Sequence, residues 1–411
     1  MPERRVVITG LGWVTSLGTS VPEVFERLCQ GHSGIKPITR FDANAHGVTF
    51  GGECTDFTPE PQVDHRTAKK LDRFSQLAVC AAVDAVDNAK LDFEQEDPFR
   101  CGAIIGSGVG GIEEFAEGHA KMLDKGPTRI SPFMVPKLMC NAAPGNVAIR
   151  FGLKGPNYAT TSACASAGHA IGAAYDQIRA GHADVIVTGG AEAALTPLGL
   201  ATFVVLKALS KRNDDPEKAS RPFDQDRDGF VLAEGAGIVI LESLEHAQAR
   251  GAQPVAEMLG WGQSNDGHHI TAPLEHGEGA AAAMTAALNH SGLQPADIDY
   301  INAHGTSTGL GDLAETRAVR SVFGQDAPPT SSTKSMLGHL LGASGGVETI
   351  ICTQALQTGL CPPTINHENP GEGCDLDYLP NQARQVNPRV VLNNSFGFGG
   401  HNTSLAFAKF E

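Results

Sequence analysis

The chain has 411 residues, enough for two to three domains at roughly 150 residues each, and its 41% apolar and 19% charged residues exclude an intrinsically disordered protein. A net charge of −15, from 31 basic and 46 acidic residues, argues against a nucleic-acid-binding surface. The 48 glycines follow no three-residue period, so they indicate tight turns and close backbone contacts, and not a collagen-like repeat.

Short β-branched and apolar runs predict buried strands along the whole chain. The first run begins at Val6 with no apolar targeting region before it, so we predict no signal peptide. No run approaches 18 apolar residues, so we predict no membrane-spanning segment. The predicted strands are Val6–Thr9, Cys101–Ile105, Tyr158–Ala163, Asp184–Thr188, Gly237–Leu241, Ile298–Ala303, Val390–Asn394 and Thr403–Phe410.

A helix with one buried face is predicted between Ala163 and Asp184, closed by Gly181. The strand–helix–strand order predicts a right-handed crossover in a mostly parallel sheet. A polar stretch at Glu245–Pro254 marks the predicted boundary between two domains, 1–250 and 251–411. Cys361–Gly371 is a predicted surface loop. The buried face of the helix consists of Ala167, Ile171, Ala174 and Ile178.

Gly106–Gly111 reads G-x-G-x-x-G directly after a predicted strand, a pattern that can hold a pyrophosphate at a helix N-terminus. The acidic residue expected about 20 positions later is not clearly placed at a strand end, since Asp124 lies in a polar stretch. We therefore favour a tight turn that lines another kind of pocket, with an NAD-linked oxidoreductase as the alternative.

Two further patterns resemble metal sites only in part. Asp224–Gly229 opens like a calcium loop, but the closing acid, Glu234, comes one residue early and Gly235 occupies the twelfth position. The neighbouring His268 and His269 have no third ligand at a suitable spacing. We predict no metal site in either segment.

The nine cysteines are odd in number and form no C-x-x-C pair, which favours free thiols in a reducing cytosol. Cys164 differs from the rest, because a β-like run stops there and a helix of small residues begins at the cysteine itself. Helix N-terminal N–H groups favour a thiolate, and small neighbours admit a substrate carbonyl close to a backbone oxyanion donor. Cys164 is the predicted nucleophile.

Two histidines occupy comparable turns and are the candidate partners of this thiol. His304 follows a predicted strand, and His339 precedes a Gly/Ser-rich segment and another helix. Such turns are where α/β sheets build their functional sites.

Together with Cys164, His304 and His339, several motifs make the chain resemble the elongating class I/II β-ketoacyl-acyl-carrier-protein synthases, most of all class II. The likeness covers nearly the whole chain, and its Cys-His-His set differs from the Cys-His-Asn set of initiating synthases and from thiolases, which carry a second cysteine. The motifs are Arg221-Pro-Phe-Asp, Arg227-Asp-Gly-Phe, Glu234-Gly-Ala-Gly, Ala303-His-Gly-Thr-Ser-Thr and Asn394-Ser-Phe-Gly-Phe-Gly-Gly. At His401 the commonest family pattern has threonine.

This resemblance implies a thiolase-like α/β fold, with two similar halves in five α/β/α/β/α layers, usually as a homodimer. It also implies roles for individual side chains. Val109 would limit the length of the acyl chain, with Phe203 in the same wall, and Phe398 would gate the site and supply an oxyanion N–H. Thr306 and Thr308 would bind pantetheine, and the histidines would be supported by Lys334, Glu315 and Glu348. The carrier would dock on Lys69, Lys70, Arg129 and Lys207.

The implied function is a decarboxylative Claisen condensation of an acyl group on Cys164 with malonyl-acyl-carrier-protein, in cytoplasmic fatty-acid elongation. The product is a 3-oxoacyl-carrier two carbons longer, and neither an organic cofactor nor a metal is needed. Two further alternatives are a polyketide ketosynthase of the same fold and a non-catalytic chain-length factor. The latter proteins lack the nucleophilic cysteine, so Cys164 argues against that second alternative.

Overall fold

A computed structural model describes residues 4–411 of the chain, which leaves residues 1–3, ahead of the first predicted strand, outside the described part. Within it, ten strands form one mixed sheet made of two five-stranded parts. The first part has the order β5 (Asn157–Thr160), β4 (Cys101–Gly106), β6 (Val185–Glu192), β7 (Gly235–Ser243), β1 (Val6–Val14). The second has the order β10 (Thr330–Ser331), β9 (Tyr300–Asn302), β13 (Val390–Gly397), β14 (His401–Ala408), β8 (Ala256–Asn265).

The two parts repeat one topology. The parts meet where β1 pairs with β8. If the strands of each part are numbered along the chain, their order outward from this pair is first, fifth, fourth, second, third in both parts. In both, the fourth, second and third strands run parallel, and the fifth is antiparallel to its two neighbours. The sheet is therefore mixed and not mostly parallel as predicted, because the fifth strand of each part runs back antiparallel beside the fourth.

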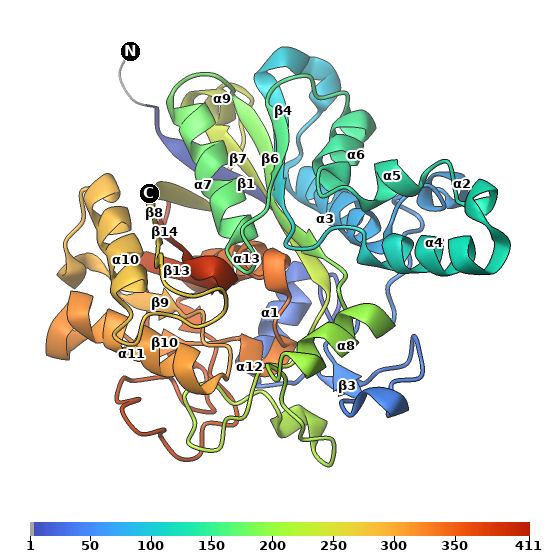
Figure 1. Cartoon of the computed structure of the whole chain (residues 1–411). Coiled ribbons are helices and arrows are strands. Elements are labelled where there is room, and N and C mark those ends of the chain that lie inside the picture. The colour runs from blue at the N-terminus through green and yellow to red at the C-terminus, as the bar shows by residue number, and fades with distance from the viewer. Residues whose placement is uncertain (1–3) are drawn as a thin grey trace.

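Helices cover both parts and also fill the space between them (Figure 1). Helix α3 (Arg73–Ala89) packs on β1 and β7, whereas α10 (Glu278–Ser291) packs on β8 and β14. Between them, α7 (Ser166–Arg179) and α13 (Ser344–Thr358) contact each other and strands of both parts. These contacts give the five-layered thiolase-like architecture that the sequence predicts.

Small residues allow the central helices to approach the strands. A Cβ atom on Gly237 of β7 would lie 2.2 Å from the backbone nitrogen of Val347 in α13. The predicted apolar face of α7 is confirmed, since its four residues are completely buried. Ordinary side chains at such contacts would force the helix away from the sheet.

The remaining elements surround this frame. The other helices are α1 (Val21–Cys29), α2 (His65–Ala68), α4 (Ile112–Lys125), α5 (Met134–Leu138), α6 (Ala142–Phe151), α8 (Pro197–Val205), α9 (Leu244–Ala249), α11 (Gly309–Phe323) and α12 (Lys334–Leu337). Two short ribbons pair β2 (Lys36–Pro37) with β3 (Phe50–Gly51), and β11 (Leu360–Cys361) with β12 (Arg384–Gln385). Over residues 4–411, no helix combines the length and apolar character that crossing a bilayer requires.

All eight predicted strands exist in the ten-stranded sheet, but two strands of that sheet and the four strands of the two short ribbons were not predicted, and several boundaries differ. The unpredicted β8 contains Gly260 and Gly262 and has little of the β-branched composition of a typical strand. Its glycines are needed because α10 lies directly on it: a Cβ on Gly262 would lie 2.1 Å from the carbonyl oxygen of Ala283. The other unpredicted strand of that sheet, β10, has only two residues.

Candidate active site

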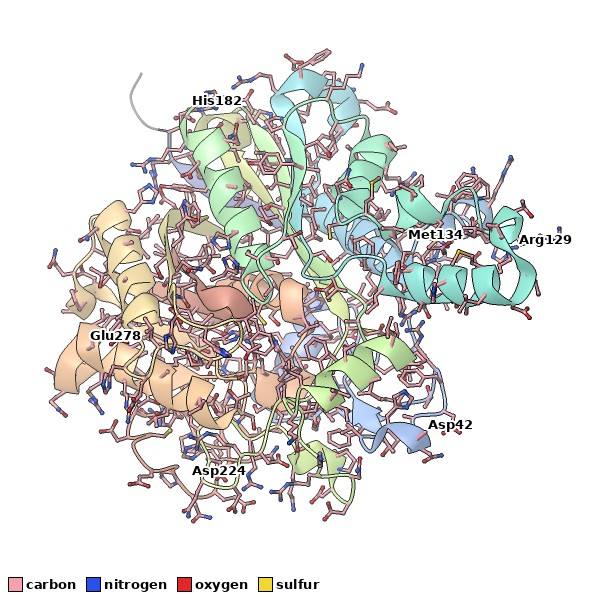
Figure 2. The ribbon with its side chains drawn as sticks, viewed as in Figure 1. Asp42, Arg129, Met134, His182, Asp224 and Glu278 are labelled. Carbon is pink, nitrogen blue, oxygen red and sulfur yellow. The ribbon has the colours of Figure 1, made fainter. Side chains whose placement is uncertain are left out.

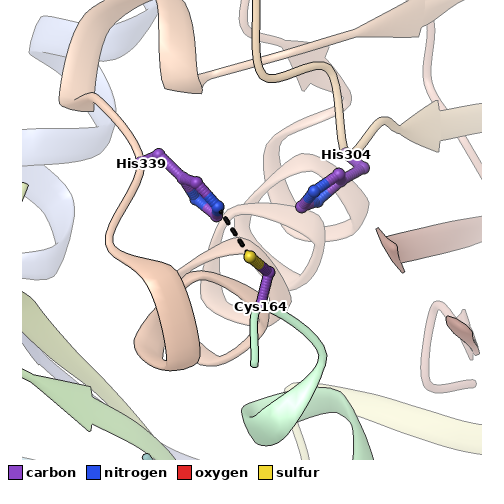
Figure 3. A group of neighbouring side chains, drawn as sticks. All are labelled: Cys164, His304 and His339. Carbon is purple, nitrogen blue, oxygen red and sulfur yellow. Dashed lines mark hydrogen bonds between the residues drawn. The ribbon is translucent and has the colours of Figure 1, made fainter. Parts of the chain in front are cut away.

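Three loops from both halves bring Cys164, His304 and His339 together (Figure 3). Cys164 lies between β5 and α7, His304 follows β9, and His339 lies between α12 and α13. The cysteine sulfur and one ring nitrogen of each histidine all lie within 4.8 Å of one another. His339 Nε2 is 3.0 Å from Cys164 Sγ, and the two imidazole rings meet edge to face with centroids 5.3 Å apart.

The backbone around Cys164 is held in an unusual conformation. Ala163 has a left-handed φ of +49°, which costs about 1–3 kcal/mol for a residue with a Cβ atom. The Ser166 hydroxyl offsets this cost, since it donates to the Ala163 carbonyl oxygen (2.7 Å) and accepts from the Ser162 N–H (2.9 Å). Helix α7 therefore begins at Ser166, two residues after the cysteine and not at it. The sulfur is thereby presented to a cavity.

Burial has the largest effect on the pKa of the Cys164 thiol. It raises the pKa of Cys164 to about 11, although the backbone N–H of Phe398 and the charge of Lys334 act in the opposite direction. Burial thus acts against the thiolate that the helix N-terminus is expected to favour, because desolvation outweighs the local donors. A base must take the proton, and His339 Nε2 is at hydrogen-bond distance.

Both histidines are neutral near pH 7. Burial, together with the positive charge of Lys334, holds the pKa of His304 and of His339 well below the ordinary value. His339 Nδ1 lies 3.0 Å from the Ser344 hydroxyl, which can either donate or accept a proton. The Nε2 atom of His339 can therefore serve as base in one step and as donor in another.

The predicted supporting residues lie behind the histidines. Glu315 accepts hydrogen bonds from the backbone N–H groups of His304 and Gly305, both 2.7 Å, and burial raises its pKa to about 7. Lys334 forms a buried ion pair with Glu348. Glu315 also reaches the cavity wall, whereas the lysine pair does not. These contacts fix the His304 loop and place a positive charge beside the site.

A cavity of about 450 Å³ opens onto the three reactive groups. It contains most of the other predicted site residues. Its walls include Val109, Phe203, Thr306, Thr308, Phe398 and Lys207, together with Cys164 and the two histidines. The structure thus collects the predicted acyl, pantetheine and gating positions in one space.

Sequence reasoning missed several residues of this site. Phe230 packs edge to face on His339, with centroids 5.2 Å apart, and Phe396 lies 6.0 Å from His304. Asp312, buried in α11, accepts the backbone N–H groups of Phe223 and Ser307. Both phenylalanines belong to motifs quoted above, so the signal was present in the sequence. Asp312 has no such signal.

The glycine-rich loop 106–111 does follow a strand and lead into α4, as a dinucleotide site requires. Its donors are already used, however. The backbone N–H groups of Gly108 and Val109 both donate to the buried carboxylate of Glu192. A pyrophosphate would find no free donor there and would meet a negative charge, which argues against the dinucleotide alternative.

The two segments that resemble metal sites have other roles. Both carboxylate oxygens of Asp224 (labelled in Figure 2) accept hydrogen bonds, from Arg221 and from three backbone N–H groups. His268 and His269 lie in an exposed loop, where His269 Nδ1 accepts backbone N–H groups. Among residues 4–411, one set of three ligand atoms converges, namely Cys164, His304 and His339. Thiol and imidazole would suit Zn²⁺, but such a metal would occupy the nucleophile. A metal-free site stays a prediction.

The predicted carrier-docking side chains are exposed. Lys69 and Lys70 directly follow α2 and Arg129 follows α4, and these elements lie together on one side of the molecule (Figures 1 and 2). Lys70 Nζ lies 5.9 Å from the centre of the Phe133 ring, and Lys207 stands at the wall of the cavity.

Comparison with known proteins gives two adjacent family matches. Residues 3–247 match the beta-ketoacyl synthase N-terminal domain, and residues 255–368 match the beta-ketoacyl synthase C-terminal domain. A 3-oxoacyl-[acyl-carrier-protein] synthase 2 from Synechocystis sp. is 49% identical over 413 residues, which covers 100% of this chain and 99% of that protein. The protein of that name from Staphylococcus aureus is 47% identical over 410 residues, 99% of each chain.

Solved structures agree with this similarity. The ishigamide ketosynthase/chain length factor superposes with a TM-score of 0.94 at 37% identity, over 100% of both chains. A type II polyketide ketosynthase in complex with its acyl-carrier protein superposes with a TM-score of 0.90 at 32% identity, over 99% of this chain and 100% of that one.

Proposed function

Because the chain belongs to the beta-ketoacyl synthase family, we propose that Cys164 is its nucleophile and that His304 and His339 stabilise the charge of its transition states. The chain is an acyltransferase that condenses an acyl group with malonyl-acyl-carrier-protein to give a 3-oxoacyl-carrier and CO₂ in fatty-acid elongation. The observation that carries the residue assignment is the convergence of one thiol and two neutral imidazoles in one buried cavity.

In the first half-reaction, the Cys164 thiol gives its proton to His339 Nε2, 3.0 Å away, and the sulfur attacks the thioester carbon. The oxyanion forms near the backbone N–H groups of Phe398 and Cys164, which already point at the sulfur. The bond from the carbonyl carbon to the pantetheine sulfur then breaks. The leaving thiolate takes the proton from His339, so the acyl group ends on Cys164 and the imidazole is neutral again.

In the second half-reaction, malonyl-carrier loses CO₂ and the electron pair moves into an enolate on the thioester oxygen. Two imidazole N–H donors suit that oxygen, because its charge appears only as CO₂ leaves. The enolate carbon attacks the acyl carbon, and the bond from that carbon to the Cys164 sulfur breaks. The Cys164 thiolate then takes one proton from solvent, which restores the thiol and leaves His339 neutral.

Acylation of Cys164 is the direct test of this assignment. After incubation with an acyl-carrier substrate, intact-mass spectrometry should show one added acyl group, located on the Cys164 peptide. An unmodified protein that instead quenches nicotinamide fluorescence would support the oxidoreductase alternative. Fatty-acid elongation is favoured over a polyketide role because the full-length relatives at 47–49% identity are 3-oxoacyl synthases.

We propose that the acyl carrier docks on the side formed by α2, α4 and α5 and reaches the cavity at Lys207. Acyl carrier proteins are acidic and this chain carries a net charge of −15, so attraction must be local. Lys69, Lys70, Arg129 and Lys207 are exposed and supply that local positive charge.

Reversing the charge of Lys69 and Lys70 should weaken the binding of carrier-bound substrates to the enzyme. For the double variant Lys69→Glu/Lys70→Glu we expect the apparent KM for malonyl-carrier to rise roughly tenfold at low ionic strength and much less at high salt. The matched control, Lys154→Glu/Lys409→Glu, makes the same change in net charge at exposed positions outside the cavity wall. An equal KM increase in both variants would place docking elsewhere.

Val109 should determine which acyl chains fit. It lines the cavity beside Cys164, so Val109→Phe fills part of the space that a long chain needs. Each excluded CH₂ forgoes about 0.8 kcal/mol of burial, so the loss should grow with chain length. We expect the variant to keep activity on short acyl-carriers and to lose most of it beyond roughly eight carbons.

The measurement is kcat/KM across a series of acyl-carriers of increasing length. Val204→Phe, in a neighbouring helix but outside the residues that line the cavity, is the matched control and should leave the length profile unchanged. A uniform loss at every length in Val109→Phe would remove Val109 from the acyl wall.

We also propose that the protein is a homodimer, that each subunit consists of two domains, 1–250 and 251–411, and that it acts in the cytoplasm. Strand β5 is the outer strand of its sheet part, and Tyr158 on it is 38% exposed, which supports a partner at this edge. The boundary near residue 250 is supported by the repeated topology, which restarts at β8 after α9. All nine cysteines are free, which supports a reducing compartment. Sedimentation velocity would test the dimer.

A further inference from the structure

Glu192, the last residue of β6, connects two active-site loops that come from different halves of the chain. Its side chain is completely buried, and its carboxylate accepts four hydrogen bonds. The donors are the Ser107 hydroxyl (2.9 Å) and Val109 N–H (3.2 Å) to Oε1, and Gly108 N–H (2.7 Å) and Gly342 N–H (3.1 Å) to Oε2. One oxygen thus joins the loop after β4 to the loop that precedes α13.

The two loops touch around this carboxylate with no spare space. A Cβ atom on Gly108 would come within 2.8 Å of Glu192 Oε2, and a Cβ on Gly342 within 2.7 Å of the same oxygen. That Cβ on Gly342 would also lie 2.3 Å from the backbone nitrogen of Gly108. A displacement of either loop must therefore stretch these bonds or move the other loop.

The bonded residues are close in sequence to groups with proposed roles. Val109 itself lines the acyl wall, and Gly342 follows His339 by three residues. The His339 side chain also has a hydrogen-bonded neighbour at the start of α13, the Ser344 hydroxyl. Anchoring Gly342 therefore limits how far the His339 imidazole can move relative to Cys164.

We propose that Glu192 is a positioning residue that ties the acyl wall at Val109 to His339, so that one carboxylate sets both chain-length selection and the alignment of the proton donor. The inference rests on the proposed roles of Val109 and His339. An acyl chain long enough to press on Val109 displaces residues 107–109, which supply three of the four donors. Glu192 transmits that displacement to Gly342, whereas a short chain leaves the loop in place.

Glu192→Gln tests this role with almost no change in volume. The amide places an NH₂ group where one carboxylate oxygen stood, and each oxygen accepts at least one backbone N–H, so in either orientation at least one contact becomes donor against donor. We expect kcat for condensation to fall roughly tenfold or more, with the KM for malonyl-carrier nearly unchanged. The ratio of kcat/KM for long over short acyl-carriers should also change several-fold. A residue that only stabilises the fold would neither lower kcat per folded molecule at an unchanged KM nor change the ratio for long over short acyl-carriers.

Glu242→Gln is the matched control. Glu242 is also completely buried on the neighbouring strand β7, where it binds Thr9, His246 and Arg250 away from the cavity. This control should lower the melting temperature and leave kcat per folded molecule and the chain-length ratio unchanged. If Glu192→Gln gives too little folded protein, Ser107→Ala removes one of the four donors and should shift the ratio in the same direction by a smaller factor.

Unchanged kcat and an unchanged chain-length ratio in folded Glu192→Gln or Ser107→Ala would overturn the inference. So would equal kinetic changes in Glu192→Gln and Glu242→Gln. The Val109→Phe series separates this outcome from failure of the proposed function. If Val109→Phe shortens the accepted chain and the Glu192 variants have no effect, the acyl wall stands and the connection through Glu192 is wrong.

Discussion

Replacing Cys164 by alanine is expected to abolish elongation. Without the sulfur there is no acyl-enzyme, and the condensing step has no bound electrophile. Removing the nucleophile of a covalent mechanism costs on the order of 10⁶-fold in rate. We expect no detectable 3-oxoacyl-carrier, and no acyl adduct by intact-mass spectrometry, when Cys164→Ala is incubated with acyl- and malonyl-carrier.

A buried cysteine elsewhere supplies the control for this experiment. Cys352 lies in α13 and is completely buried, but it does not line the cavity. Cys352→Ala leaves a small hole in the core and should lower stability while it keeps the acyl adduct and the condensing activity of the folded fraction. Condensation above the uncatalysed rate in Cys164→Ala would show that another residue carries the acyl group.

Removing either histidine should slow decarboxylation by about 100-fold or more, since the loss of one oxyanion donor costs about 3 kcal/mol. The two variants should differ in the first half-reaction. His339 lies 3.0 Å from the Cys164 sulfur, so His339→Ala should slow both acylation and decarboxylation. His304→Ala should mainly slow decarboxylation. The measurements are CO₂ release from malonyl-carrier and the rate of Cys164 acylation by mass spectrometry.

The pH dependence follows from the direction of the histidine pKa values. Burial holds both well below 6.5, so both imidazoles remain neutral as the pH falls from 8 to 6. The histidines should therefore cause no loss of decarboxylation rate over that range, and the loss that they cause should come at lower pH, where an imidazole gains a proton. Glu315, whose pKa is about 7, is the group behind His304 that gains a proton within the range, and Glu315→Gln removes that titration. A decline centred near pH 6.5 that persists in Glu315→Gln would mean that at least one histidine is as basic as an exposed one.

The local order of strands and turns is what the sequence predicts best. Runs such as Cys101–Ile105 are buried and β-branched, and the structure has strands at every predicted run. The residues that meet in the cavity could also be named, because Cys164, His304 and His339 each stand in a distinctive Gly/Ser-rich turn. Their roles are a separate matter and stay predictions.

Properties that depend on distant contacts could not be predicted. The pKa of the Cys164 thiol depends mainly on its burial, which the small residues around it do not reveal. The four donors to Glu192 come from positions 83 to 150 residues away. Strand β8 could not be recognised from its sequence, because it contains glycines at positions where α10 lies against the strand. In each case the decisive neighbour lies in another part of the chain.

The repeated topology has a consequence for how this protein can diversify. In each half, the turn after the second strand and the turn before the central helix converge on the cavity. The first half uses them for Val109 and Cys164, and the second half uses them for His304 and His339. Sequence changes around Val109 can therefore alter which acyl chain is held, and changes around Cys164, His304 and His339 can alter how fast it reacts. Glu192 is hydrogen-bonded to loops of both halves, so a substitution there should affect both properties at once.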